Sequence, residues 1–383
     1  MNKLPQAQEA VAASDLDAWL LYDFRGSNPL LRQLLGASPH STRRVFLYVP
    51  RSGEPVFLVH QVDAGHFPGD GLTIQPYQDR ENLLGALKEL LRGKSRVAME
   101  YSPMGALPTL SHVDGGTLEL VRSFGVTVES SAELAQYALC RLTPDELASH
   151  RRAATTLGEI VHQAFAHIGK HVGHIQEHEV AEFIRQRFVE LGLVIDAGPI
   201  VAVNAHAGDP HYEPLAPDSS MINRGDWVLI DLWAKEPGGI YGDITWTAFV
   251  GESPSADQRR VFDIVTSARD AAIAFLQQEV AAGRFPVGAT ADEVARKYIE
   301  EAGYGPQFTH RLGHSLGDEV HGYGANLDSF ETQETRRLVP GLAFTIEPGV
   351  YLPTFGVRSE VDLYMTAAGP EITTPVQREI VLI

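Results

Sequence analysis

The sequence predicts a protein of mixed α/β and α+β class, with a small N-terminal α/β domain over residues 1–140 and a larger domain over residues 141–383. Three observations lead to this prediction. The chain has 383 residues, which is typical of two domains. Strand patterns alternate with a helical pattern in the first third. A helix-start signal follows residue 140, where a new run of long helices begins.

The first third has the pattern of a compact α/β domain. Residues 81–92 carry apolar side chains at helical spacing, and Gly93 follows as a stop signal. Shorter apolar runs predict strands on both sides of this helix. These strands are expected over residues 16–23, 45–49, 55–59 and 96–99.

The larger domain begins with a local signal for a helix. Thr143 is expected to be the N-cap, Pro144 the first helical residue, and Glu146 the partner of the cap three residues later. Apolar spacing then predicts four helices in this domain. Their expected ranges are 145–168, 177–191, 255–282 and 291–302.

Composition excludes several classes of protein. The net charge of −18 argues against nucleic acid or an anionic membrane as a partner, because both bind basic patches. The single cysteine, Cys140, permits neither an intrachain disulfide nor a cysteine metal cluster, which favours a reducing compartment. No apolar run approaches the roughly 20 residues that span a bilayer, and the N-terminus lacks the apolar core of a signal peptide. We therefore expect a cytoplasmic protein.

One stretch of the larger domain carries two acids in apolar surroundings. Residues 227–232 predict a strand that contains Asp231, and residues 240–245 predict a returning strand that contains Asp243. The Pro237-Gly238-Gly239 turn between them is typical of a hairpin. A carboxylate inside an apolar strand costs several kcal/mol unless a cation neutralises it. A divalent metal would neutralise this pair, although both acids could also be ordinary residues of a strand end or turn.

The pattern of acids in apolar strands recurs near the C-terminus. Strands are predicted over residues 342–350, with Glu347, and 356–365, with Glu360. A glycine-rich segment before them holds three histidines, His310, His314 and His321. Burying four unpaired carboxylates would cost more than the net stability of a domain, which is about 5–15 kcal/mol. Because carboxylate and imidazole are common metal ligands, the sequence predicts a metal site.

These motifs together resemble the creatinase/aminopeptidase family of pita-bread metallopeptidases, which includes methionine aminopeptidase, aminopeptidase P and prolidase. The segment IDLWA…YGDIT resembles the two-aspartate hairpin of the family, HRLGHSLGDEVH its histidine segment, and FTIEPGVY and GVRSEVD its two glutamate strands. The resemblance covers residues 143–383, and the N-terminal domain is similar to that of the creatinase/prolidase/aminopeptidase P branch. It implies a creatinase-like N-terminal domain and a C-terminal pita-bread catalytic domain.

The chain departs from the family pattern at three places. Asp231 and Asp243 are twelve positions apart, where the family usually has eleven. Trp233 replaces a glycine, and Trp246 replaces an arginine. We expect the two tryptophans to affect the wall of the substrate pocket more than the chemistry.

The resemblance implies a ligand set for two divalent ions. The set is Asp231, Asp243, His314, Glu347 and Glu360. Asp243 and Glu360 would bridge the ions, Asp231 would complete one site, and His314 and Glu347 the other. Oxygen ligands with one imidazole favour Mn²⁺, with Co²⁺ or Zn²⁺ as alternatives. Two such ions share a bridging water whose pKa falls toward neutrality, which yields the hydroxide that attacks the peptide carbonyl.

Further residues are assigned by the same resemblance. Glu347 would also act as general base, and His321 and His211 would stabilise the oxyanion. His211, His310 and His321 are expected to contact the substrate, with His310 also orienting the site. Arg358 lies two residues before Glu360 and could grip a substrate carboxylate, and an ion pair to a site acid is its alternative role.

The family resemblance implies hydrolysis of Xaa-Pro bonds, with a small peptide that has proline at its second position as substrate. Dipeptides are the first expectation, because Arg358 could hold the proline carboxylate. The alternatives are an Xaa-Pro aminopeptidase that cleaves longer peptides, a metal-dependent lyase or a catalytically dead binding protein on the same fold, and a creatinase-like amidinohydrolase. The intact ligand set disfavours the last, because that branch lacks it. A homodimer is also implied by the resemblance alone.

Overall fold

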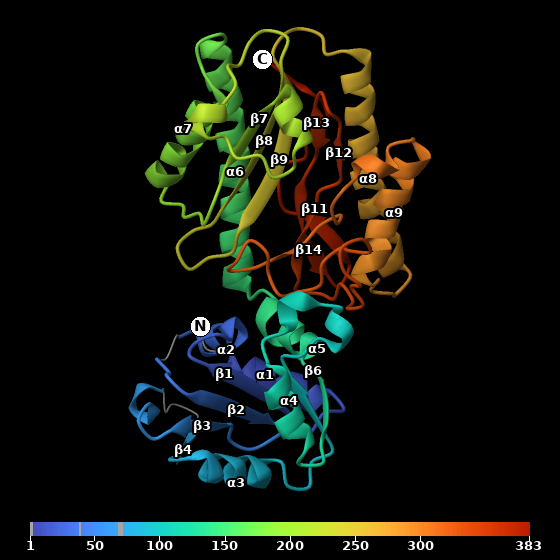
Figure 1. Ribbon diagram of the computed structural model, residues 1–383. Helices are drawn as coiled ribbons and strands as arrows, with labels where there is room; N and C mark the ends of the chain where they lie inside the picture. The colour runs from blue at the N-terminus through green and yellow to red at the C-terminus, as the bar shows by residue number, and fades with distance from the viewer. Residues whose placement is uncertain (1–2, 38–39, 68–71) are drawn as a thin grey trace. The chain divides into compact units, whose positions relative to one another are not determined.

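The computed structural model describes residues 3–37, 40–67 and 72–383 (Figure 1). The chain divides into two compact units, Met1–Arg141 and Leu142–Ile383. Each unit has its own sheets and its own hydrophobic core. The two units are described separately below.

The N-terminal unit is built on a six-stranded sheet with the order β4-β3-β2-β1-β5-β6. β1 pairs antiparallel with β2 and parallel with β5, so the sheet is mixed. The strands are β1 (Ala18–Phe24), β2 (Arg44–Pro50), β3 (Val56–His60), β4 (Thr73–Tyr77), β5 (Arg96–Met99) and β6 (Thr127–Ser130). The helices are α1 (Leu4–Ala13), α2 (Pro29–Leu35), α3 (Arg80–Leu90), α4 (Gly115–Arg122) and α5 (Ala132–Ala135). The α/β class predicted for this region is confirmed.

A buried acid lies at the centre of this unit. Glu100 follows β5 and is fully buried. Its carboxylate accepts hydrogen bonds from the Trp19 indole at 2.5 Å, the Asn28 side chain at 2.9 Å and the Tyr22 backbone at 3.2 Å. Burial nevertheless raises the pKa of Glu100 to about 7, because desolvation outweighs these bonds.

The C-terminal unit places its strands between two pairs of long helices (Figure 1). α6 (Pro144–His171) and α7 (Glu177–Glu190) cover one sheet, in which the strand order is β16-β9-β8-β7. α8 (Ala256–Ala281) and α9 (Gly288–Glu301) lie on the side of the second sheet, in which the order is β10-β11-β14-β15. The first sheet holds β7 (Ile200–Val203), β8 (Trp227–Ala234), β9 (Gly242–Phe249) and β16 (Val381–Leu382).

The helix starts follow the local signals in the sequence. Thr143 caps α6, and its hydroxyl and the Glu146 carboxylate form the reciprocal bonds of a capping box, as predicted. α6 continues through Gly169 to His171 and is therefore longer than the predicted 145–168. Among the described residues, no helix combines the length and apolar composition required to cross a membrane.

The two C-terminal strands predicted to be continuous are each broken in two. The run 342–350 forms β11 (Ala343–Ile346) and β12 (Gly349–Tyr351), and the run 356–365 forms β13 (Gly356–Arg358) and β14 (Val361–Thr366). β11 pairs with β14 in the four-stranded sheet, which β10 (Ser315–Leu316) and β15 (Gly369–Ile372) complete, whereas β12 and β13 form a separate hairpin. Both breaks coincide with a predicted ligand, Glu347 in one and Glu360 in the other. The breaks free these residues from the strand ladders and bring them to one place.

Candidate metal centre and substrate cavity

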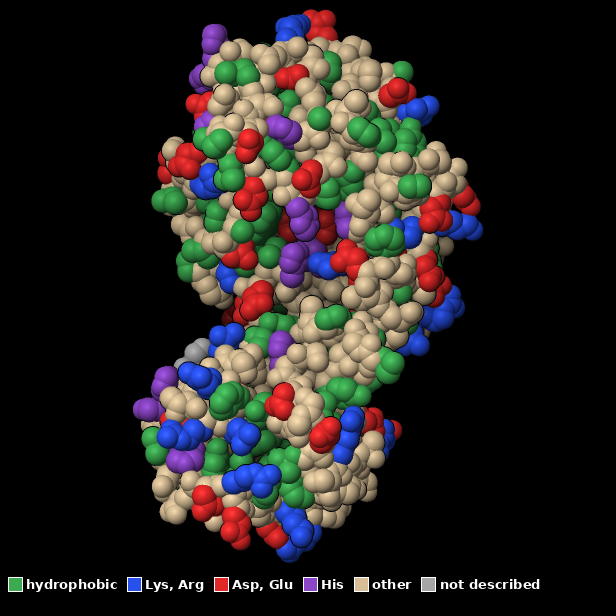
Figure 2. Space-filling view, viewed as in Figure 1, with side chains coloured by type: hydrophobic (Ala, Val, Ile, Leu, Met, Phe, Trp, Pro, Cys, Tyr) green, Lys and Arg blue, Asp and Glu red, His purple; other side chains and the backbone are tan. Residues whose placement is uncertain are grey.

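Histidine and acidic side chains gather around a hollow in the C-terminal unit (Figure 2). The hollow is a cavity of about 710 Å³. Every site residue predicted from the sequence lines it: Asp231, Asp243, His314, Glu347, Glu360, His211, His310, His321 and Arg358. The fold thus brings together residues from four separate stretches of the chain.

The β8–β9 hairpin supplies the two aspartates. They are offset from each other across the hairpin, because Asp231 pairs with Thr245 and Asp243 pairs with Trp233. Residues two apart on a strand share one face, so both carboxylates project on the cavity side. Both aspartates are more than nine-tenths buried. The hairpin thus presents two carboxylates on one face, offset by two residues along the strand direction.

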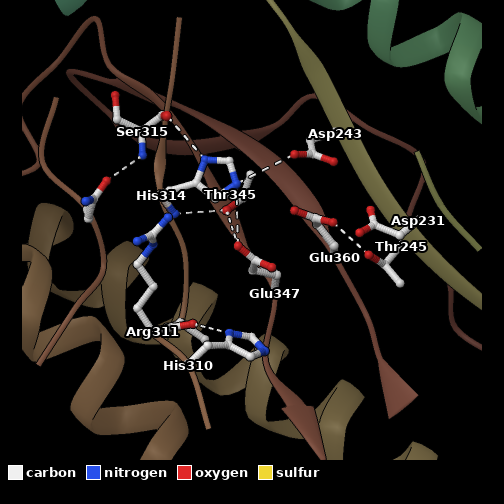
Figure 3. A network of polar contacts seen from close by, with 12 residues as sticks. Asp231, Asp243, Thr245, His310, Arg311, His314, Ser315, Thr345, Glu347 and Glu360 are labelled. Atoms are coloured by element: carbon white, nitrogen blue, oxygen red, sulfur yellow. Dashed lines mark hydrogen bonds and ion pairs between the residues drawn. The ribbon is translucent and has the colours of Figure 1, made fainter. Parts of the chain in front are cut away.

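The glutamates are fixed by backbone bonds to other segments of the site. The Glu347 backbone N–H donates to the Leu312 carbonyl at 2.8 Å, in the histidine segment. The Glu360 backbone N–H reaches the Thr245 carbonyl of β9 at 3.3 Å, and the Thr245 hydroxyl donates to the Glu360 carboxylate at 2.8 Å. The carboxylates of Glu347, Glu360 and Asp243 point toward a common space in Figure 3.

His314 presents a free electron pair to this space. Its Nδ1 lies 3.3 Å from the Ser315 carbonyl, so Nδ1 carries the proton. Its Nε2 lies 3.6 Å from Asp243 Oδ2 and 3.5 Å from Glu347 Oε1 (Figure 3). Burial lowers the pKa of His314, which keeps the ring neutral and able to ligate a cation.

The charges at this centre are unbalanced. Burial is the main cause of a raised pKa in Asp243, Glu347 and Glu360, and neighbouring carboxylates raise the pKa of Asp243 and Glu360 further. Within the described part of the chain, the buried Oδ1 atoms of Asp231 and Asp243 have no hydrogen-bond partner. One ligand atom from each of Asp243, His314 and Glu360 lies within 4.8 Å of the others. Unpartnered carboxylate oxygens beside a neutral imidazole fit a divalent cation.

Arg358 sits at the edge of this cluster in a chain of hydrogen bonds. Its Nη2 bonds to Asp231 Oδ2, and its Nε donates to the Thr245 hydroxyl at 2.9 Å. Its Nη1 donates to the Tyr351 hydroxyl at 3.0 Å, and that hydroxyl lies 2.7 Å from His310 Nε2. His310 Nδ1 lies 2.7 Å from the Arg311 carbonyl and carries the ring proton, so the Tyr351 hydroxyl donates to Nε2. His310 is thus held by this series of hydrogen bonds. Of the two roles expected for Arg358, the structure contains the ion pair with a site acid.

The remaining two histidines lie at the cavity wall. The ring of His321 meets the His314 ring edge to face, with centroids 4.4 Å apart. Electrostatic interaction with the neighbouring His314 and burial lower the pKa of His321 to about 3, so its ring is neutral. His211 lies on an exposed loop, where its backbone N–H donates to the Asp209 side chain at 3.0 Å.

The model of one protein family matches most of the C-terminal unit. The model of metallopeptidase family M24 matches residues 148–367, more than half of the sequence. The chain belongs to metallopeptidase family M24. It is therefore an enzyme of the peptidase class with the pita-bread fold, as the sequence motifs predicted.

Individual relatives cover nearly the whole chain. A putative dipeptidase of Bacillus subtilis, YkvY, is 27% identical over 90% of this chain and 90% of its own. The crystal structure of dipeptidase PepE from Mycobacterium ulcerans has a TM-score of 0.75 at 24% identity and covers 99% of this chain and 96% of its own. The prolidase from Pyrococcus horikoshii has a TM-score of 0.67 at 23% identity and covers 99% of both chains.

Two residues important to this M24 site were not found from the sequence. Glu177 is fully buried and accepts bonds from the Tyr212 hydroxyl at 2.7 Å, the Val203 backbone at 2.7 Å and the Ser220 backbone at 2.6 Å. It thereby anchors the loop that carries His211, yet in the sequence it has the ordinary appearance of an acid in the first turn of a helix. Tyr351 is the last residue of β12, which has an ordinary strand pattern, and no local signal marks its hydroxyl.

Proposed function

We propose that the protein hydrolyses Xaa-Pro dipeptides with two divalent metal ions. The observation that carries this proposal is the convergence of the five proposed metal ligands, three further histidines and Arg358 on one cavity. Its similarity to a putative dipeptidase, a dipeptidase and a prolidase supports the same substrate class.

Asp231, Asp243, His314, Glu347 and Glu360 would hold the ions, and Mn²⁺ is the proposed metal. Two divalent ions at such a site would lower the pKa of a shared water and polarise the substrate carbonyl. The unpartnered carboxylate oxygens and the neutral His314 ring fit this role.

The side chains would then position the peptide and move the proton. Glu347 is the proposed general base, because its carboxylate lies in the cavity and burial raises its pKa. His321 is neutral, so a ring N–H is available to donate to the developing oxyanion. His211 would approach the same oxygen from the loop that Glu177 anchors.

Longer peptides form a second candidate substrate class, for one structural reason. Arg358 is engaged with Asp231, Thr245 and Tyr351, so a substrate carboxylate would have to share a guanidinium that is already bonded. An Xaa-Pro aminopeptidase needs no such grip, because its substrate continues beyond proline.

The deciding experiment compares Ala-Pro with Ala-Pro-Ala. The enzyme is stripped with EDTA, reloaded with Mn²⁺, and assayed with both peptides by chromatography of the products. We expect cleavage of Ala-Pro alone, lost on stripping and restored by the metal. Cleavage of Ala-Pro-Ala would establish an aminopeptidase, and cleavage of neither would overturn the Xaa-Pro assignment.

A homodimer and a cytoplasmic location also stay predictions, the first from the family resemblance and the second from the single cysteine. Light scattering on the purified protein measures the first, with twice the 41.9 kDa chain mass as the expected result.

A further inference from the structure

Trp233 stands inside the cavity, where the family pattern has a glycine. It lies opposite Asp243 in the β8–β9 hairpin and two residues beyond Asp231, so its side chain projects on the same face as both acids. The indole is half-buried and lines the cavity directly. A large ring therefore occupies space beside the metal-binding acids that a glycine would leave open.

The ring is fixed in position from two sides. Its Nε1 donates to Asp196 Oδ1 at 2.9 Å. Its outer edge touches Gly198 so closely that a Cβ on that glycine would lie 2.5 Å from the Trp233 Cη2. Trp233 and Val320 also pack against one apolar cluster and line the same cavity. The indole is thus a fixed wall, because moving it would break a hydrogen bond and a close contact together.

The position of the two acids indicates which part of a peptide meets this wall. Arg358 bonds to the Asp231–Thr245 pair of the hairpin, and Trp233 stands at the next pair on the same face, with Asp243. The two pairs are about 7 Å apart at the strand rise per residue. The carbonyl of the scissile bond belongs to the first residue of an Xaa-Pro peptide. In the proposed function the ions that Asp231 and Asp243 would hold polarise this carbonyl, so the first side chain lies beside these two acids and meets Trp233.

We propose that Trp233 determines specificity by filling the space for the first side chain of the substrate, so that the enzyme favours small residues before proline. This inference rests on the proposed function and adds to it the size of the residue Xaa. Displacing the ring would break the Asp196 bond and the Gly198 contact, so bulky first residues are disfavoured. Removal of the ring is then expected to extend the range of substrates.

The test is a size series at the first position. kcat/KM is measured for Ala-Pro, Leu-Pro and Phe-Pro with the Mn²⁺-loaded wild type and with Trp233→Ala and Trp233→Leu. We expect the ratio of Phe-Pro to Ala-Pro to rise about tenfold or more in Trp233→Ala, because a single methylene group in an apolar pocket already changes discrimination by about 10–200-fold. Trp233→Leu is expected to give an intermediate ratio, and it replaces Trp233→Ala should that variant fail to fold.

Trp246→Phe is the matched control. Trp246 lies on the same hairpin but, contrary to the expectation from the sequence, is buried against His162 and does not line the cavity. Its substitution is expected to leave the ratio unchanged. An unchanged ratio in folded, metal-loaded Trp233 variants would overturn the inference.

A binding measurement separates this inference from the proposed function. Phe-Pro and Ala-Pro analogues with a reduced peptide bond are titrated calorimetrically into the Mn²⁺-loaded proteins. If the wild type cleaves no dipeptide, the proposed function fails. The ratio of the two affinities then still tests whether Trp233 limits the size of the first side chain. Equal ratios for the wild type and Trp233→Ala in this titration would refute the role of Trp233 by itself.

Discussion

Arg358 and Asp231 form an ion pair at the edge of the candidate metal site, with both side chains almost entirely buried. The same guanidinium holds Thr245 at 2.9 Å and Tyr351 at 3.0 Å. Because a planar guanidinium donates in fixed directions, these bonds define the position of Asp231 relative to β12 and β9. Arg358 therefore holds the side chains of the site in position before any substrate binds.

Arg358→Gln is expected to lower kcat/KM for Ala-Pro and for Ala-Pro amide by a similar factor, about 10–100-fold. The reason is that Asp231 loses its partner whatever group follows proline. Steady-state kinetics with both substrates measure this, with the exposed Arg260→Gln as control. A loss confined to the substrate with a free carboxylate would show instead that Arg358 grips that group.

Asp243→Asn is expected to abolish metal binding and activity while raising the stability of the metal-free protein. Burial and the neighbouring Asp231 raise the pKa of Asp243, so its ionised form is unfavourable without a cation, and a neutral amide of the same shape removes that cost. Mn²⁺ at a hundred times its Kd should stabilise the wild type by about 2.7 kcal/mol and the variant by nothing. Thermal unfolding with and without Mn²⁺ measures both effects.

The exposed Asp257→Asn serves as control for this variant and should respond to Mn²⁺ as the wild type does. An Asp243→Asn protein that binds metal and cleaves peptide would contradict the assignment of Asp243 as a ligand.

Tyr351→Phe is expected to lower kcat/KM by about tenfold without preventing metal binding. The substitution removes the hydroxyl that connects Arg358 with His310 and leaves both side chains without one buried partner. Metal content by elemental analysis and kcat/KM are measured together. Tyr298→Phe, on the exposed face of α9, is the control. Full activity in Tyr351→Phe would mean that the chain from Arg358 to His310 has no part in positioning the site.

Glu100 is expected to make the stability of the N-terminal unit fall as the pH rises. Its folded pKa of about 7 exceeds the ordinary value of 4.5, so the folded state holds the proton more tightly than the unfolded state. Stability is then highest below pH 4.5, decreases between pH 4.5 and 7, and is constant above, with a total change of about 3 kcal/mol. Glu100→Gln should remove this slope.

Trp19 provides the measurement for Glu100. It is the only one of the four tryptophans in this unit, and it donates to Glu100. Its fluorescence during urea unfolding at several pH values reports the stability of the N-terminal unit. A wild-type slope identical to that of Glu100→Gln would mean that Glu100 does not titrate in this range.

The side chains of the candidate site could be identified from the sequence because they are charged residues within apolar segments. Asp231, Asp243 and Glu360 stand in runs that otherwise read as buried strand, where an ionised group is costly. The start of α6 was predictable for a different reason, since the capping box of Thr143 and Glu146 involves only neighbouring residues.

The breaks at Glu347 and Glu360 were not predictable because their cause is remote. An apolar run such as 342–350 looks continuous, and it ends only because the Glu347 N–H finds its acceptor at Leu312 rather than in a strand ladder. The role of Glu177 was hidden in the same way, since its Ser220 partner lies 43 residues away. α1 and α2 were missed because they are short and depend on packing within the unit.

The main-chain anchoring of the two glutamates has a consequence for selectivity among ions. Glu347 is tied to the histidine segment and Glu360 to β9 by backbone bonds that do not involve an ion. The proposed donors are thus preorganised, and little reorganisation energy would accompany the loading of an ion. Such a site would discriminate between cations by ionic radius and by the cost of removing their water shell, because the protein has little freedom to deform around a misfitting one.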